Sequence, residues 1–168
     1  MMRIPVPTRS ILVVLLTAAL STGIMAGCGT ESRENGQAAG NAGVSSVKKA
    51  DGIQVTLRSE PKVAKPGGEF SLTLNVRNLS GESRTFTLPS AQNYEFISTA
   101  KGGGQVWRWS NGMMFAQVVT PMKMAAGESS VFKAAWDPAG LSTGKYTIQG
   151  YFLGMDQLRP TVTVEIAR

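Results

Sequence analysis

The sequence is 168 residues long, contains one cysteine and no histidine, and carries a formal net charge of +6 at pH 7. A chain of this length is typical of a single domain. The absence of histidine excludes a Ser-His-Asp triad, a Cys-His dyad and a histidine-ligated zinc or copper site. A lone cysteine cannot form a disulfide within the chain, so the core alone must hold the fold. The basic residues are spread thinly, which does not favour a nucleic-acid partner.

Residues 1–27 have the pattern of a secretory signal. Two arginines precede an apolar run at positions 11–20, and the segment ends in Ala26-Gly27-Cys28. This ending resembles the lipobox of bacterial lipoproteins, so we expect residues 1–27 to be a signal peptide and Cys28 to be lipidated. The protein would then lie at the extracytoplasmic face of the cell membrane, held by its lipid anchor. The alternatives are an ordinary secretory signal or an uncleaved anchor, although the apolar run is short for a span of roughly 20 residues.

Residues 28–50 are poor in large apolar side chains, with only Val44 and Val47. Such a segment buries too little surface to offset the entropy that it would lose on ordering. We therefore expect residues 28–50 to be a disordered tether. The folded domain should then comprise residues 51–168.

The pattern of residues 51–168 is that of an all-β domain. Apolar and polar side chains alternate with a period of two at 53–58, 70–77, 146–149 and 162–166, which is typical of half-buried strands. Turn sequences rich in glycine, proline and asparagine separate these segments. Short strands with frequent turns, and no amphipathic helix, predict an antiparallel immunoglobulin-like β-sandwich.

The densest aromatic cluster surrounds Trp107 and Trp109. In a strand these two side chains point to one face and Arg108 points to the other. The following Asn111-Gly112 predicts a β-hairpin with a type I′ turn. The tryptophans could form a sugar-binding platform, but burial is the interpretation that we favour. We expect these aromatic residues in the core: Tyr94, Phe96, Trp107, Trp109, Phe115, Trp136 and Tyr146.

Five methionines offer thioether ligands of the kind that bind Cu(I). They are Met113, Met114, Met122, Met124 and Met155. Methionine more often fills gaps in a core. We therefore expect no metal site and no cofactor.

Several segments resemble the BsuPI family of bacterial intracellular proteinase inhibitors. They are QNYEF at 92–96, VWRWSNGMMFAQ at 106–117, AAGES at 125–129, and Trp136 followed by GKYTIQGYF at 144–152. The resemblance covers roughly residues 70–152, and its most specific motif is the pair of tryptophans flanking an arginine before Asn-Gly. It implies a small all-β domain and, for the founding members, inhibition of an intracellular serine proteinase. It fixes no reactive-site residue, and the export signal places a cytoplasmic target out of reach of this chain.

Two functions are consistent with such a domain. A serine proteinase inhibitor needs a rigid extended loop that pairs with the substrate cleft, and the candidate loops are 98–105 and 110–114. The alternative is a cell-envelope protein interaction or structural module without inhibitory activity. We expect no enzyme, because no paired carboxylates or activated nucleophile are visible. The expected partner of this monomer is a serine proteinase or another envelope protein, contacted through Arg108, Asn111, Gly112 and Met113.

Overall fold

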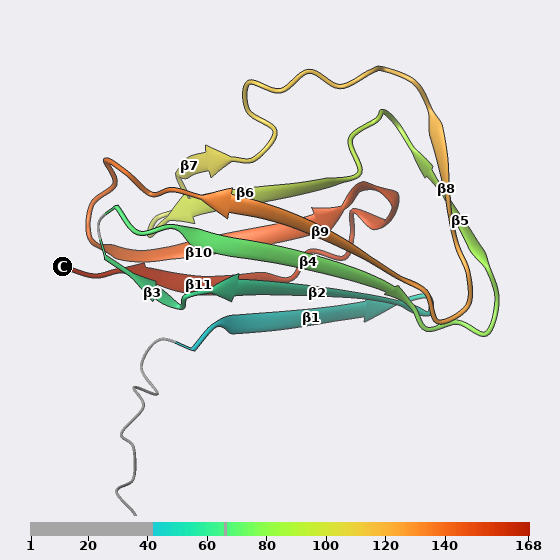
Figure 1. Ribbon diagram of the computed structural model, residues 1–168, viewed down its shortest axis with the longest axis horizontal. Coiled ribbons are helices and arrows are strands. Elements are labelled where there is room, and N and C mark those ends of the chain that lie inside the picture. The colour runs from blue at the N-terminus through green and yellow to red at the C-terminus, as the bar shows by residue number, and fades with distance from the viewer. Residues whose placement is uncertain (1–41, 66) are drawn as a thin grey trace, which may run out of the picture. The chain divides into compact units, whose positions relative to one another are not determined.

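The computed structural model describes residues 42–65 and 67–168 (Figure 1). The predicted signal peptide, Cys28 and the predicted tether up to residue 41 lie outside the described residues. Within the described part of the chain, no helix has the length and apolar character that a membrane span requires.

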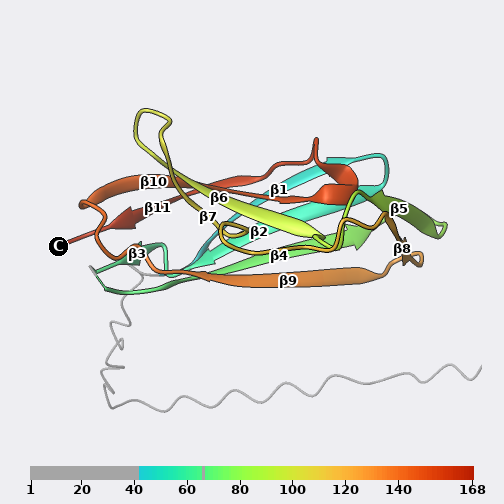
Figure 2. The same cartoon turned by 90° about the horizontal axis from the view of Figure 1, so that it is seen from above.

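The strands form two main sheets that pack face to face, and a separate ribbon (Figures 1 and 2). The first sheet has the order β1 (Val44–Ala50), β2 (Ile53–Glu60), β4 (Phe70–Asn78) and β9 (Ser129–Trp136). The second has the order β3 (Val63–Ala64), β11 (Thr161–Ile166), β10 (Gly144–Phe152), β6 (Tyr94–Ala100) and β7 (Gln105–Arg108). The ribbon pairs β5 (Arg84–Leu88) with β8 (Thr120–Met124), and a short 3-10 helix, η1 (Leu153–Met155), follows β10.

The alternation of apolar and polar residues sets which face of each strand is buried. In β2 and β4, the register partners Leu57 and Leu74 are both fully buried and point into the sandwich. Gly150 of β10 lies against them, and a Cβ at this position would approach the Cδ1 atom of each leucine at 3.1 Å. The absence of a side chain at Gly150 therefore lets β10 pack closely against the middle of the first sheet.

Aromatic side chains fill one end of the sandwich. Trp136 is 1% exposed, and its ring stacks on Phe70 with a centroid distance of 5.2 Å. Of the aromatic residues predicted for the core, Phe96, Trp136 and Tyr146 are buried. Tyr94, Trp107 and Trp109 are half-buried and pack against the core, while Phe115 is half-buried in the connection that follows β7.

The strand order and one tyrosine define the fold as immunoglobulin-like. The sequence β11-β10-β6-β7 in the second sheet corresponds to strands G, F, C and C′ of that fold. Tyr146, near the start of β10, donates from its hydroxyl to the Ser142 carbonyl at 2.7 Å, which is the tyrosine corner expected at the start of strand F. The prediction of an immunoglobulin-like sandwich of antiparallel sheets is thus confirmed, with the short β3 pairing in parallel to β11.

The predicted boundary between tether and domain at residue 50 is wrong. Val44–Ala50 forms β1, and each residue pairs with β2, from Val44 opposite Ser59 to Ala50 opposite Ile53. Asp51 and Gly52 connect the two strands with φ angles of +50° and +74°, as a type I′ hairpin turn requires. Backbone pairing to β2 orders this polar segment, and the folded domain therefore extends at least to Val44.

Asn78 fixes the ribbon to the end of the first sheet. Its side chain is fully buried, and Nδ2 donates to the carbonyls of Glu82, Met124 and Ala125 at 2.8, 3.2 and 3.0 Å. Buried amides are stable only when their hydrogen bonds are made. The end of β8 is therefore held in a defined position relative to β4.

Candidate binding site

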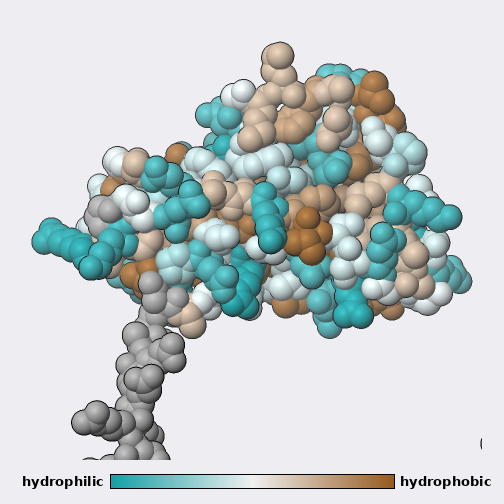
Figure 3. Space-filling model, viewed as in Figure 1, coloured by the Kyte–Doolittle hydropathy of each residue, from teal (hydrophilic) through white to brown (hydrophobic). Residues whose placement is uncertain are grey.

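The connection between β7 and β8 presents the most exposed apolar segment of the described residues. It crosses the top of the molecule in Figure 1, from the end of β7 to the start of β8. We call residues 110–119 the β7–β8 loop. Of seven large apolar residues that are exposed in the described part of the chain, four lie in it: Met113, Met114, Val118 and Val119, at 47, 99, 61 and 66% exposure. Figure 3 shows apolar surface along the top, where this loop runs.

Glu95 holds the first residue of the β7–β8 loop. Its side chain is 4% exposed and lies on the face of β6 opposite to the inward-pointing Phe96. Its carboxylate accepts hydrogen bonds from the N–H of Ser110 at 3.2 Å and from the Ser110 hydroxyl. It also accepts from Gln92 Nε2 and from the Phe96 N–H, each at 3.1 Å. A buried carboxylate is costly unless such donors surround it, so the loop starts at a fixed point.

The negative charge of Glu95 acts on two neighbours. Arg108 Nε lies 3.7 Å from a carboxylate oxygen, with 43% of the arginine side chain exposed, and an ion pair so open to solvent contributes little to stability. Burial, and then the charge of Glu95, raise the pKa of Tyr94 above its ordinary value of 10.0. Both causes disfavour the tyrosinate anion.

An aromatic stack supports the loop from below. The Tyr94 ring stacks on Trp109 at 4.1 Å and on Phe132 of β9 at 4.8 Å. Trp109 in turn contacts Phe115, with 5.9 Å between the ring centroids. The loop is thereby linked through its own Phe115 to both sheets of the sandwich.

Three backbone hydrogen bonds shape the loop, and the first runs from the Asn111 N–H to the Arg108 carbonyl at 3.2 Å. The Met113 N–H donates to the Ser110 carbonyl at 3.0 Å, and the Ala116 carbonyl accepts from the Ala91 N–H at 3.0 Å. The third bond joins the loop to the connection between β5 and β6. Met114 lies between Met113 and Ala116, and neither its N–H nor its carbonyl makes a hydrogen bond to another described residue.

The predicted hairpin at Asn111-Gly112 is wrong. Gly112 has a φ of +78°, but Asn111 is not among the described residues with a positive φ, so the turn closed by Met113 and Ser110 has the pattern of type II rather than type I′. No strand follows it to pair with β7. The next strand, β8, pairs with β5, and the chain must cross to the ribbon to reach it.

The predicted binding residues form one continuous part of this region. Arg108 ends β7 with its side chain half in solvent, and Asn111, Gly112 and Met113 form the exposed turn. Half of the other predicted loop, 98–105, is strand, because β6 continues to Ala100 and β7 begins at Gln105, and the turn itself is confined to 101–104. Sequence reasoning placed Met114 within the candidate loop 110–114 without naming it as a contact residue, and it missed Glu95, Val118 and Val119. The sequence does not indicate whether a single carboxylate within a strand is buried, so Glu95 could not be identified. The two adjacent valines, Val118 and Val119, lie close to a turn sequence and could have been recognised as an exposed apolar pair.

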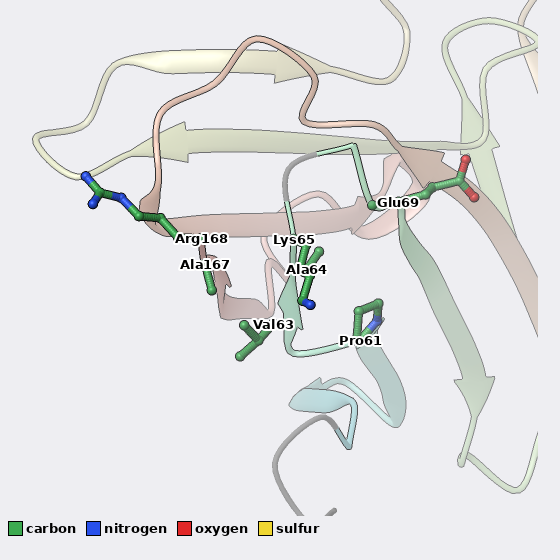
Figure 4. Close-up of a pocket in the computed structure, with 8 residues that line it drawn as sticks. Pro61, Val63, Ala64, Lys65, Glu69, Ala167 and Arg168 are labelled. Carbon is green, nitrogen blue, oxygen red and sulfur yellow. The ribbon is translucent and has the colours of Figure 1, made fainter.

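Elsewhere the described residues offer little for a small ligand or a metal. A hollow of about 450 Å³ lies beside β3 and the end of β11, and Figure 4 shows Glu69 and Arg168 at its rim pointing to opposite sides. No group of three or more acidic, histidine or cysteine residues is placed to hold a metal ion in the described part. Met124, one of the five methionines considered for copper, is fully buried in the core.

Together, the fold and the β7–β8 loop define a small immunoglobulin-like domain that presents a supported, exposed apolar loop. The chain belongs to the family described as BsuPI, intracellular proteinase inhibitor, because the sequence model of that family matches residues 57–157. This match runs from within β2 to just after η1 and includes the whole β7–β8 loop. No curated protein matches the sequence.

Solved structures with some likeness to the chain come from proteins of different kinds. An alkylpurine DNA glycosylase from Pseudomonas fluorescens, bound to DNA with an abasic site analogue, has 9% identity and a TM-score of 0.44 over 66% of this chain and 29% of that chain. A mutant β-glucosidase from Listeria innocua in complex with laminaribiose has 11% identity and a TM-score of 0.41 over 76% and 16%. A CARDB domain from Pyrococcus furiosus in complex with di-metal ions has 15% identity and a TM-score of 0.36 over 74% and 92%. Likenesses at this level carry no argument about function.

Proposed function

We propose that this protein inhibits a serine proteinase, and that its β7–β8 loop enters the substrate cleft of that proteinase. The observation that carries the proposal is an exposed apolar loop that is held near both ends by the folded domain. Membership of a family described as proteinase inhibitors supports the same function. In this account the protein acts by binding and carries out no reaction of its own.

The contacts of the loop supply the rigidity that an inhibitor needs. A proteinase cleft binds an extended chain through backbone hydrogen bonds, and tight binding depends on how little order the chain must gain on association. Ser110 is bonded to Glu95, and Ala116 is bonded to Ala91. Phe115 packs on Trp109 between these points. Each contact reduces the entropy that the loop loses on binding.

We further propose that the inhibitor acts at the extracytoplasmic face of the membrane, tethered through a lipid on Cys28. This part rests on the sequence of residues 1–28, which resembles a lipoprotein signal. The family description says intracellular, so this chain would use the same domain against a proteinase outside the cytoplasm. We propose a subtilisin-like serine proteinase as the class of target, and its cleft would take the exposed apolar side chains of the loop.

Inhibition is tested by titrating subtilisin with the full chain purified in detergent. We expect activity to fall linearly and to vanish near one inhibitor per enzyme. A variant with the four exposed apolar residues of the loop changed to serine should inhibit at least about 30-fold more weakly, the loss typical of an interface hot spot. These side chains make few contacts in the free protein, so the variant should fold normally.

The matched control changes two exposed apolar residues outside the loop, Val47 and Val131 on the first sheet, to serine. This variant should inhibit like the wild type. If the wild-type chain is inert against subtilisin and against the serine proteinases of its own cell envelope, the inhibitor proposal is rejected. The domain would then be an envelope interaction module.

A further inference from the structure

We infer that Met114 is the residue that fills the primary specificity pocket of the target, and that the target is therefore a proteinase with a deep apolar pocket. This inference rests on the proposed inhibitory function. It adds the identity of the contact residue and the substrate preference of the partner, neither of which follows from the family.

Exposure separates Met114 from the other residues of the loop. Its side chain is 99% exposed, compared with 47% for Met113 and 66% for Val119. A long, unbranched apolar side chain in water has the most to gain from burial in a pocket, at about 25 cal/mol per Å² of apolar surface. It can also adjust its shape to a pocket, because it has three freely rotating bonds. Val118 and Val119 are β-branched and stiff at χ1.

The backbone at Met114 is free to pair with an enzyme. Neither its N–H nor its carbonyl makes a hydrogen bond to another described residue. Both groups are therefore available for hydrogen bonds to the backbone at the edge of a substrate cleft. The turn before it is fixed through Ser110 to Glu95, and the chain after it is fixed at Phe115 and Ala116. Met114 is thus the free point of a loop that is held on both sides.

The same geometry explains how the chain would resist cleavage. Attack by the enzyme's serine oxygen on the Met114 carbonyl would form an ester and break the C–N bond to Phe115. The proton of the serine hydroxyl would pass to the leaving nitrogen and give a neutral primary amine on Phe115. Because Phe115 packs on Trp109 and Ala116 is bonded to Ala91, that amine stays beside the ester instead of diffusing away. The neutral amine can attack the ester and restore the peptide bond, and one of its protons returns to the serine oxygen as the serine is released.

A change of specificity tests the assignment without depending on loss of function. Full-chain wild type, Met114→Lys, Val118→Lys and Val131→Lys are assayed against subtilisin and against trypsin, whose pocket prefers a cationic side chain. We expect Met114→Lys to weaken inhibition of subtilisin by at least about 30-fold and to strengthen inhibition of trypsin by a similar factor. Val131→Lys, which adds the same charge on the first sheet, should change neither.

The outcomes separate the two proposals. If wild type inhibits subtilisin but Met114→Lys leaves both inhibition constants unchanged, the assignment of Met114 is wrong and the inhibitory function stands. Gain of trypsin inhibition by Val118→Lys instead would move the contact to Val118 and also overturn the assignment. If wild type inhibits neither enzyme nor an envelope proteinase, the proposed function fails, and this inference fails with it.

Discussion

Glu95 on β6 and Ser110 at the start of the β7–β8 loop are joined by two hydrogen bonds, from the N–H and the hydroxyl of Ser110 to one buried carboxylate. The same carboxylate accepts from Gln92 in the connection between β5 and β6. The Glu95 carboxylate therefore holds both the connection between β5 and β6 and the start of the β7–β8 loop. The same two segments are joined again by the hydrogen bond from the Ala91 N–H to the Ala116 carbonyl. The conformation of the loop depends on this buried group.

Replacing Glu95 with glutamine should loosen the loop. The amide offers one acceptor oxygen in place of two, so donors of Ser110 or Gln92 are left unpaired, at a cost of about 1–3 kcal/mol in the free energy of unfolding. We expect inhibition of the target to weaken by about 10-fold or more, which corresponds to about 1.4 kcal/mol. Urea unfolding and inhibition assays measure the two effects. Glu69→Gln, at an exposed carboxylate, is the control, and equal effects from both variants would contradict the account.

The three tryptophans should differ in their contribution to stability. Trp136 is 1% exposed and stacks on Phe70, so Trp136→Ala should cost about 3–5 kcal/mol. Trp107 and Trp109 are half-buried, and their replacement should cost less, about 1–3 kcal/mol. Trp109→Ala should weaken inhibition more than Trp107→Ala does, because only Trp109 supports Phe115. The free energies of unfolding are measured with denaturant, and equal losses for the three alanine variants would contradict the greater burial of Trp136.

Much of the sandwich could be predicted from the sequence because its central strands have one buried and one exposed face. That alternation located β2, β4, β10 and β11. The alternation did not locate β1, because β1 is an edge strand of mostly polar residues that pairs with β2 along its whole length. Of its residues, only Val44 and Ala50 pack against the core. The Asp51-Gly52 turn was the signal that marked it.

The candidate site was harder to predict because it depends on which strands pair. Asn111-Gly112 is a typical hairpin sequence, yet the strand after it pairs with β5 rather than β7. That choice turns an expected hairpin into a long exposed loop. The same path of the chain explains the burial of Glu95, because Ser110, which follows β7, lies against the Glu95 carboxylate and is bonded to it.

The pKa of Tyr94 should make stability fall at high pH. Its pKa is raised above 10.0 in the folded protein, so the unfolded chain loses this proton first as the pH rises. The stabilisation is complete below pH 10 and disappears as the pH passes the raised folded value. Tyr94→Phe should remove this part of the pH dependence, and Glu95→Gln should reduce it. Unfolding free energies measured between pH 8 and pH 11 check this, and identical slopes for wild type and Tyr94→Phe would contradict it.

The lipid anchor is a prediction about residues outside the described part of the chain. Cells fed labelled palmitate should label the wild-type protein, and Cys28→Ala should abolish the label and block normal processing. Because Cys28 is the single cysteine, no other thiol in the chain can accept the lipid. Label retained on Cys28→Ala would show that the interpretation of residues 1–28 is wrong.

Amide hydrogen exchange can locate the surface that meets a proteinase, which we propose to be the β7–β8 loop. Exchange is measured on the full chain alone and saturated with a subtilisin variant whose catalytic serine is replaced by alanine, which prevents cleavage and leaves the cleft open. We expect new protection to be concentrated at residues 113–119, while the turn at 101–104 and the first sheet exchange as in the free protein. Protection of the first sheet or of the segment at 62–68, with none in the loop, would contradict it.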